Sequence, residues 1–457
     1  MLQKCSLKPL KAFLVFGLIL SPDFLKAESV SAEPLSAGVK DGTSLSTPFE
    51  PESWPYSSLY LRFLKVEGCE KTEEETVVRI SRLKVGAELG RHDLIRAKKN
   101  LLSSGLFSRV SISGKKSPIP NQIDVQIEVE EKVSWFLAPY FALSGGKYGG
   151  GAAIGETNLF GRAIRAAAGG QWTYNNRAAF AGIRHPSLFD SVMTLSVDGL
   201  FRWQEMTEAI KDVEIRNILL VEKGFTVLPG IQWTQDFNLS IGIYWRDIDI
   251  SIRKNDTSQR ALAAQGLKEG KDIAGTLRLE FQEMNEVQGL KDGFQTNFEA
   301  QVSDSRYFSQ FNYSLQKLSL TYAVRWDNFH QVNLLSKFVM GLGQNLPFYR
   351  EFTIGGPNLR GYDNEAFRGD TRYSLYEELY FPLYRASAFL IRGIIFWDSG
   401  IIYFKESEFS RNKWRNGVGG GFRLYLHKIN IPLIGYDFAY GAESGQYHHY
   451  LQIGKEF

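Results

Sequence analysis

Cysteine is nearly absent from this chain of 457 residues, which contains only Cys5 and Cys69. So few thiols exclude a disulfide framework and a cysteine-rich metal site. Excess charge of one sign is also absent, because 53 Lys and Arg residues stand against 50 Asp and Glu residues and leave a net charge of +3. This balance gives no electrostatic reason to expect nucleic acid as a partner.

Catalytic motifs are missing as well. The sequence has neither His-Glu-x-x-His nor Gly-x-Ser-x-Gly, and its six histidines are scattered along the chain. The glycine-rich stretch 145–151 lacks the Lys-Ser/Thr of a phosphate-binding loop and is better explained as a turn between two strands. We therefore predict that the protein is not an enzyme and that it needs no cofactor and no metal.

Residues 1–27 are predicted to be a secretory signal peptide. Basic residues precede a nine-residue apolar run, Ala12–Leu20, and the small residue Ala27 follows it. The run is too short to cross a bilayer as a helix, which takes about 20 residues; a buried N-terminal helix is the alternative. Residues 28–57 are rich in Ser, Pro, Glu and Gly without periodicity, so a flexible linker is predicted there.

Residues 58–132 have the pattern of a small α+β domain. Thr72–Glu75 matches a capping box, in which the Thr hydroxyl and the Glu carboxylate bind free N–H groups where a helix begins. Apolar residues follow it at helical spacing, and they do so again between His92 and Ser104. The predicted order is β-α-α-β-β, and Cys69 is expected to be a buried apolar thiol. Strands are predicted at 60–66, 107–113 and 122–130.

Residues 133–457 show strand-like alternation instead. For example, Leu239 and Ile241 share one face of a strand, while Asn238 and Ser240 share the other. The same alternation occurs in 191–203, 273–282, 318–326 and 434–440. No run of 18 apolar residues occurs in this region, so no membrane-spanning helix is predicted there.

These long strands, with broad apolar and aromatic faces, favour a transmembrane β-barrel. A soluble β-sandwich also alternates and is the alternative. At roughly 20 residues per strand and connection, the region has room for about 16 strands. The count is 16 if 216–234 forms one long strand and 17 if it forms two. The predicted fold class is therefore mainly β, an antiparallel 16-stranded barrel preceded by one α+β domain.

Five short motifs in the strand-rich region resemble the signatures of one family. They are GETNLFG at 155–161, FTIGGPNLRGY at 352–362, ELYFPL at 378–383, FWDSG at 396–400 and QIGKEF at 452–457. In order and spacing they resemble the BamA/TamA-like outer-membrane superfamily, also called bacterial surface antigens, which includes the two-partner secretion transporters. Residues 58–132 resemble its POTRA module. The resemblance implies an outer-membrane barrel with one POTRA domain in the periplasm.

The resemblance also implies a set of functional residues. In this family an Arg-Gly-Tyr tip on the sixth extracellular loop folds back into the barrel lumen. The implied residues are the loop anchor Arg360, Gly361, Tyr362, Phe396, Asp398 and Gly400, the motif glycines Gly355 and Gly356, and the C-terminal assembly signal Ile453, Gly454 and Phe457.

The pairing of Arg360 with Asp398 is also reasonable on chemical grounds. A guanidinium group presents a planar fork of donors that matches a carboxylate. Phe396 and Gly400 share a strand face with Asp398, and an acid beside a glycine suggests a lumen-facing track that another backbone can approach. The alternative is an exposed loop arginine and a strand acid that never meet.

By resemblance, the protein is expected to insert β-barrel proteins into the bacterial outer membrane or to export polypeptide across it. Its partners are expected to be unfolded client polypeptides, outer-membrane lipid and periplasmic accessory proteins bound through the POTRA domain. Clients are expected to add a strand to the POTRA sheet edge, and the barrel to open between its first strand, 134–144, and its last, 447–457. A single POTRA domain favours an accessory role. The alternative is a passive porin or surface antigen without a client.

Overall fold

The computed structural model describes residues 59–453 with short gaps. The gaps are 145–146, 190, 211–212, 235, 254–266, 288–289, 327–330, 406–412 and 427–431. The predicted signal peptide, the predicted linker and two residues of the predicted assembly signal, Gly454 and Phe457, lie outside the described residues.

The N-terminal domain is a four-stranded sheet with two helices. Its elements are β1 (Leu59–Glu67), α2 (Glu74–Ser81), β2 (Glu88–Leu89), α3 (Arg91–Ser103), β3 (Phe107–Lys116) and β4 (Gln122–Glu131). The sheet order is β2-β1-β4-β3, with β1 parallel to β4, and apolar residues such as Val77, Leu101 and Ile127 form a core from the helices and the sheet. The β-α-α-β-β prediction is confirmed, with the two-residue β2 added between the helices. Among the described residues, neither helix is long and apolar enough to cross a membrane.

The predicted capping box at Thr72–Glu75 is wrong. Helix α2 has Glu73 at its N-cap, and that side chain makes no capping hydrogen bond. The Thr72 hydroxyl instead accepts a hydrogen bond from Asn158 Nδ2 at 2.8 Å. The carboxylate of Glu131, at the end of β4, accepts hydrogen bonds from the backbone N–H groups of residues 70–72. The carboxylate of Glu131, which is distant in sequence, therefore binds the amides just before α2. A local capping box had been expected to bind amides at the start of this helix.

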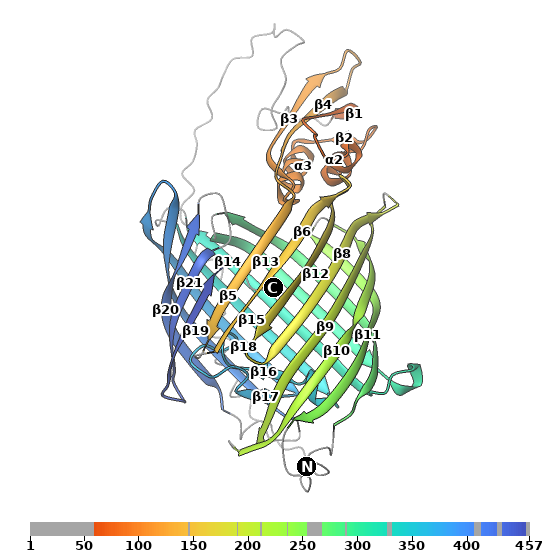
Figure 1. Ribbon diagram of the computed structural model, residues 1–457. Coiled ribbons are helices and arrows are strands. Elements are labelled where there is room, and N and C mark those ends of the chain that lie inside the picture. The colour runs from red at the N-terminus through yellow and green to blue at the C-terminus, as the bar shows by residue number, and fades with distance from the viewer. Residues whose placement is uncertain are drawn as a thin grey trace, which may run out of the picture. The chain divides into compact units, whose positions relative to one another are not determined.

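The second domain is a closed antiparallel barrel of 16 strands (Figure 1). The strands are β5 (Trp135–Ser144), β6 (Lys147–Leu159), β7 (Ile164–Thr173), β8 (Asn176–Leu188), β9 (Met193–Ile210), β10 (Val213–Gln232), β11 (Phe237–Arg253), β12 (Gly270–Val287), β13 (Leu290–Ser303), β14 (Tyr313–Trp326), β15 (Val332–Gln344), β18 (Thr371–Arg385), β19 (Phe389–Tyr403), β20 (Arg415–Leu426), β21 (Pro432–Gly441) and β22 (Tyr447–Ile453). The predicted fold class is confirmed, and β10 is the single long strand that the count of 16 required.

On strands such as β11, the barrel carries apolar side chains outside and polar side chains inside. On β11, Ile241 and Ile243 are 62% and 55% exposed, whereas Asn238 and Ser240 are only 7% and 3% exposed. A soluble protein has the reverse arrangement, with apolar groups inside. In lipid, an exposed apolar face is favourable and the closed ladder leaves no unpaired edge within the hydrocarbon.

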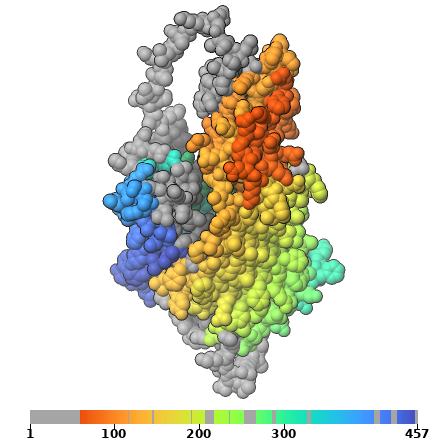
Figure 2. Space-filling view, turned by 45° about the horizontal axis from the view of Figure 1, so that its top comes forward, coloured from red at the N-terminus to blue at the C-terminus, as the bar shows by residue number. Residues whose placement is uncertain are grey.

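Strand pairing differs around the barrel wall. We call β9–β12 the long-strand wall; there β9 pairs with β10 along all 18 of its residues. We call the junction of β5 and β22 the seam; there the described pairing runs from Tyr450 opposite Ser144 to Ile453 opposite Phe141, four residues on each strand. The first barrel strands meet the last, blue strands along this junction in Figure 2.

Loop six, residues 345–370 between β15 and β18, folds into the lumen. It contains a short 3-10 helix (Phe348–Arg350) and a small hairpin of β16 (Phe352–Ile354) and β17 (Phe367–Gly369), which Figure 1 shows within the barrel. Phe352 and Ile354 are buried in a cluster with lumen-facing residues of the wall such as Leu220 and Ile248. Apolar burial therefore holds this loop in the lumen.

Candidate functional site

The tip of loop six is a tight turn that needs its glycines. Gly355 and Gly356 have positive φ angles of 127° and 61°, and the Gly356 N–H donates to the Tyr362 carbonyl at 3.0 Å. A Cβ atom on Gly356 would lie 1.8 Å from Asn364 Oδ1. Both glycines therefore permit the chain to double back and present residues 360–362 at the end of the turn.

The structure brings Arg360 and Asp398 together. Arg360 Nε donates to Asp398 Oδ2 and Nη2 donates to Oδ1, both at 2.7 Å, and the Arg360 backbone N–H also donates to Oδ2 at 3.0 Å. Asp398 lies on β19 and is fully buried. Three donors from one residue on one carboxylate make a bidentate, charge-assisted contact, the strong form of this interaction.

Further groups surround the Arg360 guanidinium. Glu378 on β18 lies 2.9 Å from Nη2, Asp437 on β21 lies 3.3 Å from Nη1, and the Phe396 ring centre is 3.5 Å from Cζ. Arg423 Nη2 also donates to Asp437, at 2.8 Å. Loop six is thus tied to three barrel strands by one side chain.

Sequence reasoning missed Glu378 and Asp437 as members of this cluster. Both carried a usable signal, because Glu378 begins the ELYFPL motif and Asp437 lies on the polar face of the alternating stretch 434–440. An acid on the lumen-facing side of a barrel strand needs a partner, and Arg360 and Arg423 supply it.

Close backbone approach occurs at the loop tip. A Cβ atom on Gly417 of β20 would lie 1.8 Å from the Arg360 carbonyl oxygen, and one on Gly441 would lie 2.2 Å from the Gly361 carbonyl oxygen. The Arg360 backbone also approaches the strand that carries Asp398, because its N–H donates to that carboxylate. A Cβ on Gly400 would come no closer than 3.3 Å, to Ser374 Oγ, so Gly417 and Gly441 provide the tightest space for the tip.

Two tyrosines connect the tip to the last strands. The Tyr450 hydroxyl on β22 accepts a hydrogen bond from the Gly361 N–H at 3.0 Å and donates to the Tyr362 carbonyl at 3.3 Å. The single proton of the Tyr362 hydroxyl has two acceptors within reach, the Glu443 carboxylate and the Asn416 carbonyl, the latter at 3.2 Å. Tyr450 also stands opposite Ser144 in the seam, so the tip is bonded directly to a seam strand.

The start of loop six has a second contact that no sequence motif indicated. Arg350 Nε lies 3.6 Å from Asp272 Oδ2 on β12, and the Arg350 guanidinium lies 4.1 Å from the Tyr244 ring centre. The Tyr313 and Tyr349 hydroxyls donate to the same Asp272 oxygen at 3.0 and 3.2 Å. Loop six is therefore held at both the long-strand wall and the seam side.

Cys69 and Ile453, two other predicted residues, lie away from the loop tip. Cys69 is half-buried beside the POTRA core rather than fully buried, and its desolvation raises the pKa of the thiol to about 11. At neutral pH the thiol is therefore protonated and a weak nucleophile. Ile453 pairs with Phe141 in the seam.

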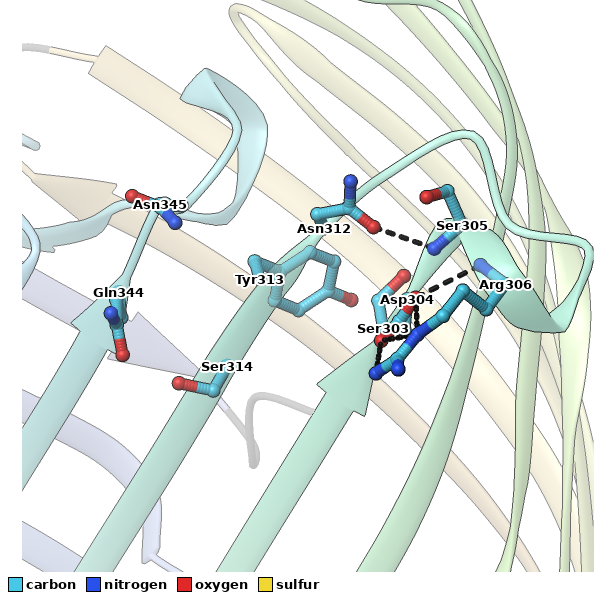
Figure 3. A pocket seen from close by; sticks show the side chains of 9 residues that line it. All are labelled: Ser303, Asp304, Ser305, Arg306, Asn312, Tyr313, Ser314, Gln344 and Asn345. Atoms are coloured by element: carbon cyan, nitrogen blue, oxygen red, sulfur yellow. Dashed lines mark hydrogen bonds and ion pairs between the residues drawn. The ribbon is translucent and has the colours of Figure 1, made fainter.

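One surface cavity, at the ends of β13 and β15 and the start of β14, has its charges neutralised locally. It has a volume of about 410 Å³ and is lined by Ser303–Arg306, Asn312–Ser314, Gln344 and Asn345. Figure 3 shows its one arginine, Arg306, directed at Asp304, with Nε 3.0 Å from the carboxylate. Because this cation and this acid satisfy each other, the cavity presents no free charge to a ligand.

Two family models match the chain. The model described as the Omp85 superfamily domain matches residues 158–457, and the POTRA model, described as a surface antigen variable number repeat, matches residues 60–132. No curated protein matches the chain. The two models agree with the closed barrel and the preceding α+β domain, and they confirm the family resemblance of the motifs.

Solved structures of related shape come from two kinds of protein. BamA from Haemophilus ducreyi lacking POTRA domains 1-3 has 13% identity and a TM-score of 0.58, and the match covers 87% of this chain and 85% of that chain. CdiB from Acinetobacter baumannii has 12% identity and a TM-score of 0.62, with 87% and 74% covered. CdiB from Escherichia coli has 12% identity and a TM-score of 0.64, with 87% and 76% covered. At these identities the likeness concerns the fold.

Proposed function

The chain belongs to the Omp85 superfamily of outer-membrane protein insertion and transport factors, and we propose that it handles client polypeptides at the seam between β5 and β22. In this proposal the barrel lies in the bacterial outer membrane and the POTRA domain lies in the periplasm. The seam opens, and an unfolded client strand pairs with the exposed edge during insertion or passes through the lumen during export.

The observation that carries this proposal is the attachment of the loop-six tip to Tyr450 on β22, one of the two seam strands. The described pairing of β5 and β22 ends at Ser144 and Ile453, where the described residues end. Separation of these two strands would expose their edges. A free strand edge then offers unpaired N–H and C=O groups to any extended chain nearby.

Loop six supports the same proposal, because its tip contacts one of the two seam strands. Its tip binds Asp398 and, through Tyr450, the last described strand. A shift of the tip would remove hydrogen bonds from β22 and favour seam opening. The anchor residues Arg360, Asp398 and Tyr450 therefore act in this proposal as a latch on the closed barrel.

The POTRA sheet offers an edge for capturing the client. In the order β2-β1-β4-β3, the ten-residue β3 (Phe107–Lys116) lies at one edge and pairs only with β4 among the described residues. The opposite edge carries only the two-residue β2. A client strand can therefore pair with β3 without any rearrangement of the sheet. The hydrogen bonds would be made by main-chain groups, so they would not depend on the client's sequence.

A passive porin or surface antigen remains the competing function. A wide open pore is disfavoured, because the loop-six hairpin lies in the lumen and is buried in an apolar cluster with the barrel wall. Likeness in shape to BamA and to CdiB supports insertion and secretion alike, so the experiment must separate these two functions as well.

A disulfide across the seam tests the proposal. Ala142 stands opposite Gln452, so the variant Ala142→Cys/Gln452→Cys, in a Cys69→Ser background, allows the seam to be locked. A matched control, Gln295→Cys/Thr321→Cys, places the same cross-strand pair between β13 and β14. Each protein is reconstituted in liposomes, and the rate at which an added unfolded β-barrel becomes protease-resistant is measured, with and without reductant.

We expect the wild-type protein and the control to accelerate client assembly, and the oxidised seam variant to do so only after reduction. Acceleration that survives the seam disulfide would contradict opening at the seam. If no form accelerates barrel assembly, protected import of a secreted polypeptide into the same liposomes separates secretion from a passive barrel. Ion conductance without either activity would favour the porin.

A further inference from the structure

A second cavity lies inside the lumen between loop six and the barrel wall. It has a volume of about 820 Å³, within the usual range for a small-molecule site. Loop six closes one side of it, and β12–β15 and β18 supply much of the rest. Six cationic side chains line it, namely Arg202, Arg278, Lys317, Lys337, Arg350 and Arg372.

The three acids of this cavity are already neutralised. Glu280 lies 3.0 Å from Arg184, Glu299 lies 2.9 Å from Arg278, and Glu351 lies 3.2 Å from Arg368. None of these carboxylates is therefore available to balance the remaining cations. Pairing of this kind is expected wherever charges leave bulk water, because an uncompensated charge is costly there.

Three of the cations form no ion pair within 4.0 Å among the described residues, namely Lys317, Lys337 and Arg372. In that part of the chain, the Arg372 guanidinium donates to neutral oxygens, those of Ser374, Tyr376 and the Thr353 carbonyl. The described lining of the cavity thus has twice as many cations as acids.

Arg350 adds a second and independent observation. Its Nε and Nη2 atoms are buried and have no hydrogen-bond partner among the described residues. Asp272 lies 3.6 Å from Nε, which is an ion pair but not a hydrogen bond. Buried guanidinium donors without acceptors are costly, so an acceptor delivered by a ligand would be stabilising.

Neutral donors continue the site into an adjoining cavity of about 460 Å³. The two cavities share Lys337 and the polar side chains of Gln295, Asn297, Ser319 and Tyr376. Amide and hydroxyl groups beside ammonium and guanidinium groups suit a ligand with several negative oxygens. The barrel wall separates this space from lipid, so the ligand must come from water.

From this charge distribution, we propose that the lumen holds a binding site for a soluble multivalent oxyanion, a phosphate or carboxylate compound. Lys317 and Lys337 supply its main charges, and Arg350 and Arg372 supply directed donors. Its binding test needs neither a client nor seam opening. The proposal also predicts that the closed lumen prefers anions to cations.

Calorimetric titration of the full-length protein with inorganic pyrophosphate, at fixed ionic strength in detergent, tests this site. We expect saturable binding by the wild-type protein. Lys317→Gln/Lys337→Gln should bind at least about tenfold more weakly, because each lost charge-assisted hydrogen bond accounts for roughly that factor. The control Lys147→Gln/Lys413→Gln removes two exposed lysines outside both cavities and should bind like the wild-type protein.

A second variant keeps the test decisive if the lysine variant does not fold. Glu299→Gln removes the acid that neutralises Arg278, so it should bind pyrophosphate more tightly than the wild-type protein. Absence of saturable binding by the wild-type protein would overturn the proposal. So would equal affinity in the wild-type protein, the lysine variant and Glu299→Gln.

Discussion

The long-strand wall and the seam are both in contact with loop six, but through different chemistry. In the wall, β9 pairs with β10 over 18 residues, and loop six packs there through apolar side chains and Arg350. At the seam, the described pairing covers four residues, and the loop tip adds directed hydrogen bonds through Tyr450. Loop six is therefore held by apolar burial and an ion pair on one side, and by directed hydrogen bonds on the other.

The difference teaches where a small change has a large effect. Loss of one contact in the wall leaves a long ladder intact. Loss of one contact at the tip removes a hydrogen bond to a strand of the seam. Mutations of equal chemistry on the two sides should therefore differ in their effect on opening, and the following experiments compare them in order of decreasing effect.

The largest effect is expected for Arg360→Ala. The change leaves the fully buried Asp398 beside Glu378 without the shared cation, and removing one partner of a buried ion pair costs about 3–5 kcal/mol. The barrel should lose its folded, faster-migrating band in electrophoresis at a clearly lower temperature. The control Arg306→Ala changes an exposed arginine of the β13–β14 loop and should leave that temperature unchanged. Equal shifts in both variants would contradict a special role of the loop tip in barrel stability.

A smaller effect is expected for Gly417→Ala, which changes shape and not charge. The new methyl group would lie 1.8 Å from the Arg360 carbonyl and push the tip away, at a cost of about 1–3 kcal/mol. Gly275→Ala on β12 is the matched change in the long-strand wall, where the nearest atom would be 4.0 Å away. Protease cleavage within loop six should rise for the first variant only. Unchanged cleavage would show that the tip tolerates displacement.

Tyr450→Phe should have a milder effect that is confined to the seam. It removes a hydroxyl that bonds both Gly361 and Tyr362, a loss of about 1 kcal/mol per hydrogen bond. Tyr313→Phe removes a comparable hydrogen bond, to Asp272 in the wall. Hydrogen exchange of the β5 amides 141–144 should speed up in the first variant and stay the same in the second. Similar exchange in both would mean that the latch does not reach the seam.

The smallest effect is expected when the pH is lowered. Acid should destabilise the POTRA domain rather than the wall or the seam. Partial burial alone raises the pKa of Glu131, but hydrogen bonds from residues 70–72 outweigh it and hold that pKa below the ordinary 4.5. A lowered carboxyl pKa stabilises the fold above pH 4.5, and this contribution disappears as the pH falls through the lowered value. Calorimetric unfolding should show the POTRA transition falling at low pH in the wild-type protein, and less so in Glu131→Gln.

Local sequence patterns predicted the strands well, because alternation in a barrel has a single cause. Each strand faces lipid on one side and the lumen on the other. The residue types of Ile241 and Ser240 therefore predict which face each occupies, without knowledge of the other strands. The contact of Arg360 with Asp398 was accessible in the same way, from residue chemistry and a family motif.

Contacts between residues distant in sequence escaped local reasoning. A capping box was expected at Thr72, but the Thr72 amide instead binds the carboxylate of Glu131, which lies 59 residues away in the sequence. Only the fold brings these two residues together. Arg350 and Asp272 belong to no motif, and their meeting depends on how loop six enters the lumen. Gly417 and Gly441, more than Gly400, make room for the tip, because its path across β20 and β21 is set by the whole barrel.

The mutual fit of Gly361 and Gly441 has a consequence for hybrid proteins. A Cβ on either glycine would strike the backbone of the other segment, at 2.5 Å from the Gly441 nitrogen or 2.2 Å from the Gly361 oxygen. Loop six and the strands that it contacts therefore have to be transferred together between homologous proteins. A chimaera that takes loop six from a relative should accept it only together with β20 and β21, and substitutions at these positions should be inherited in pairs.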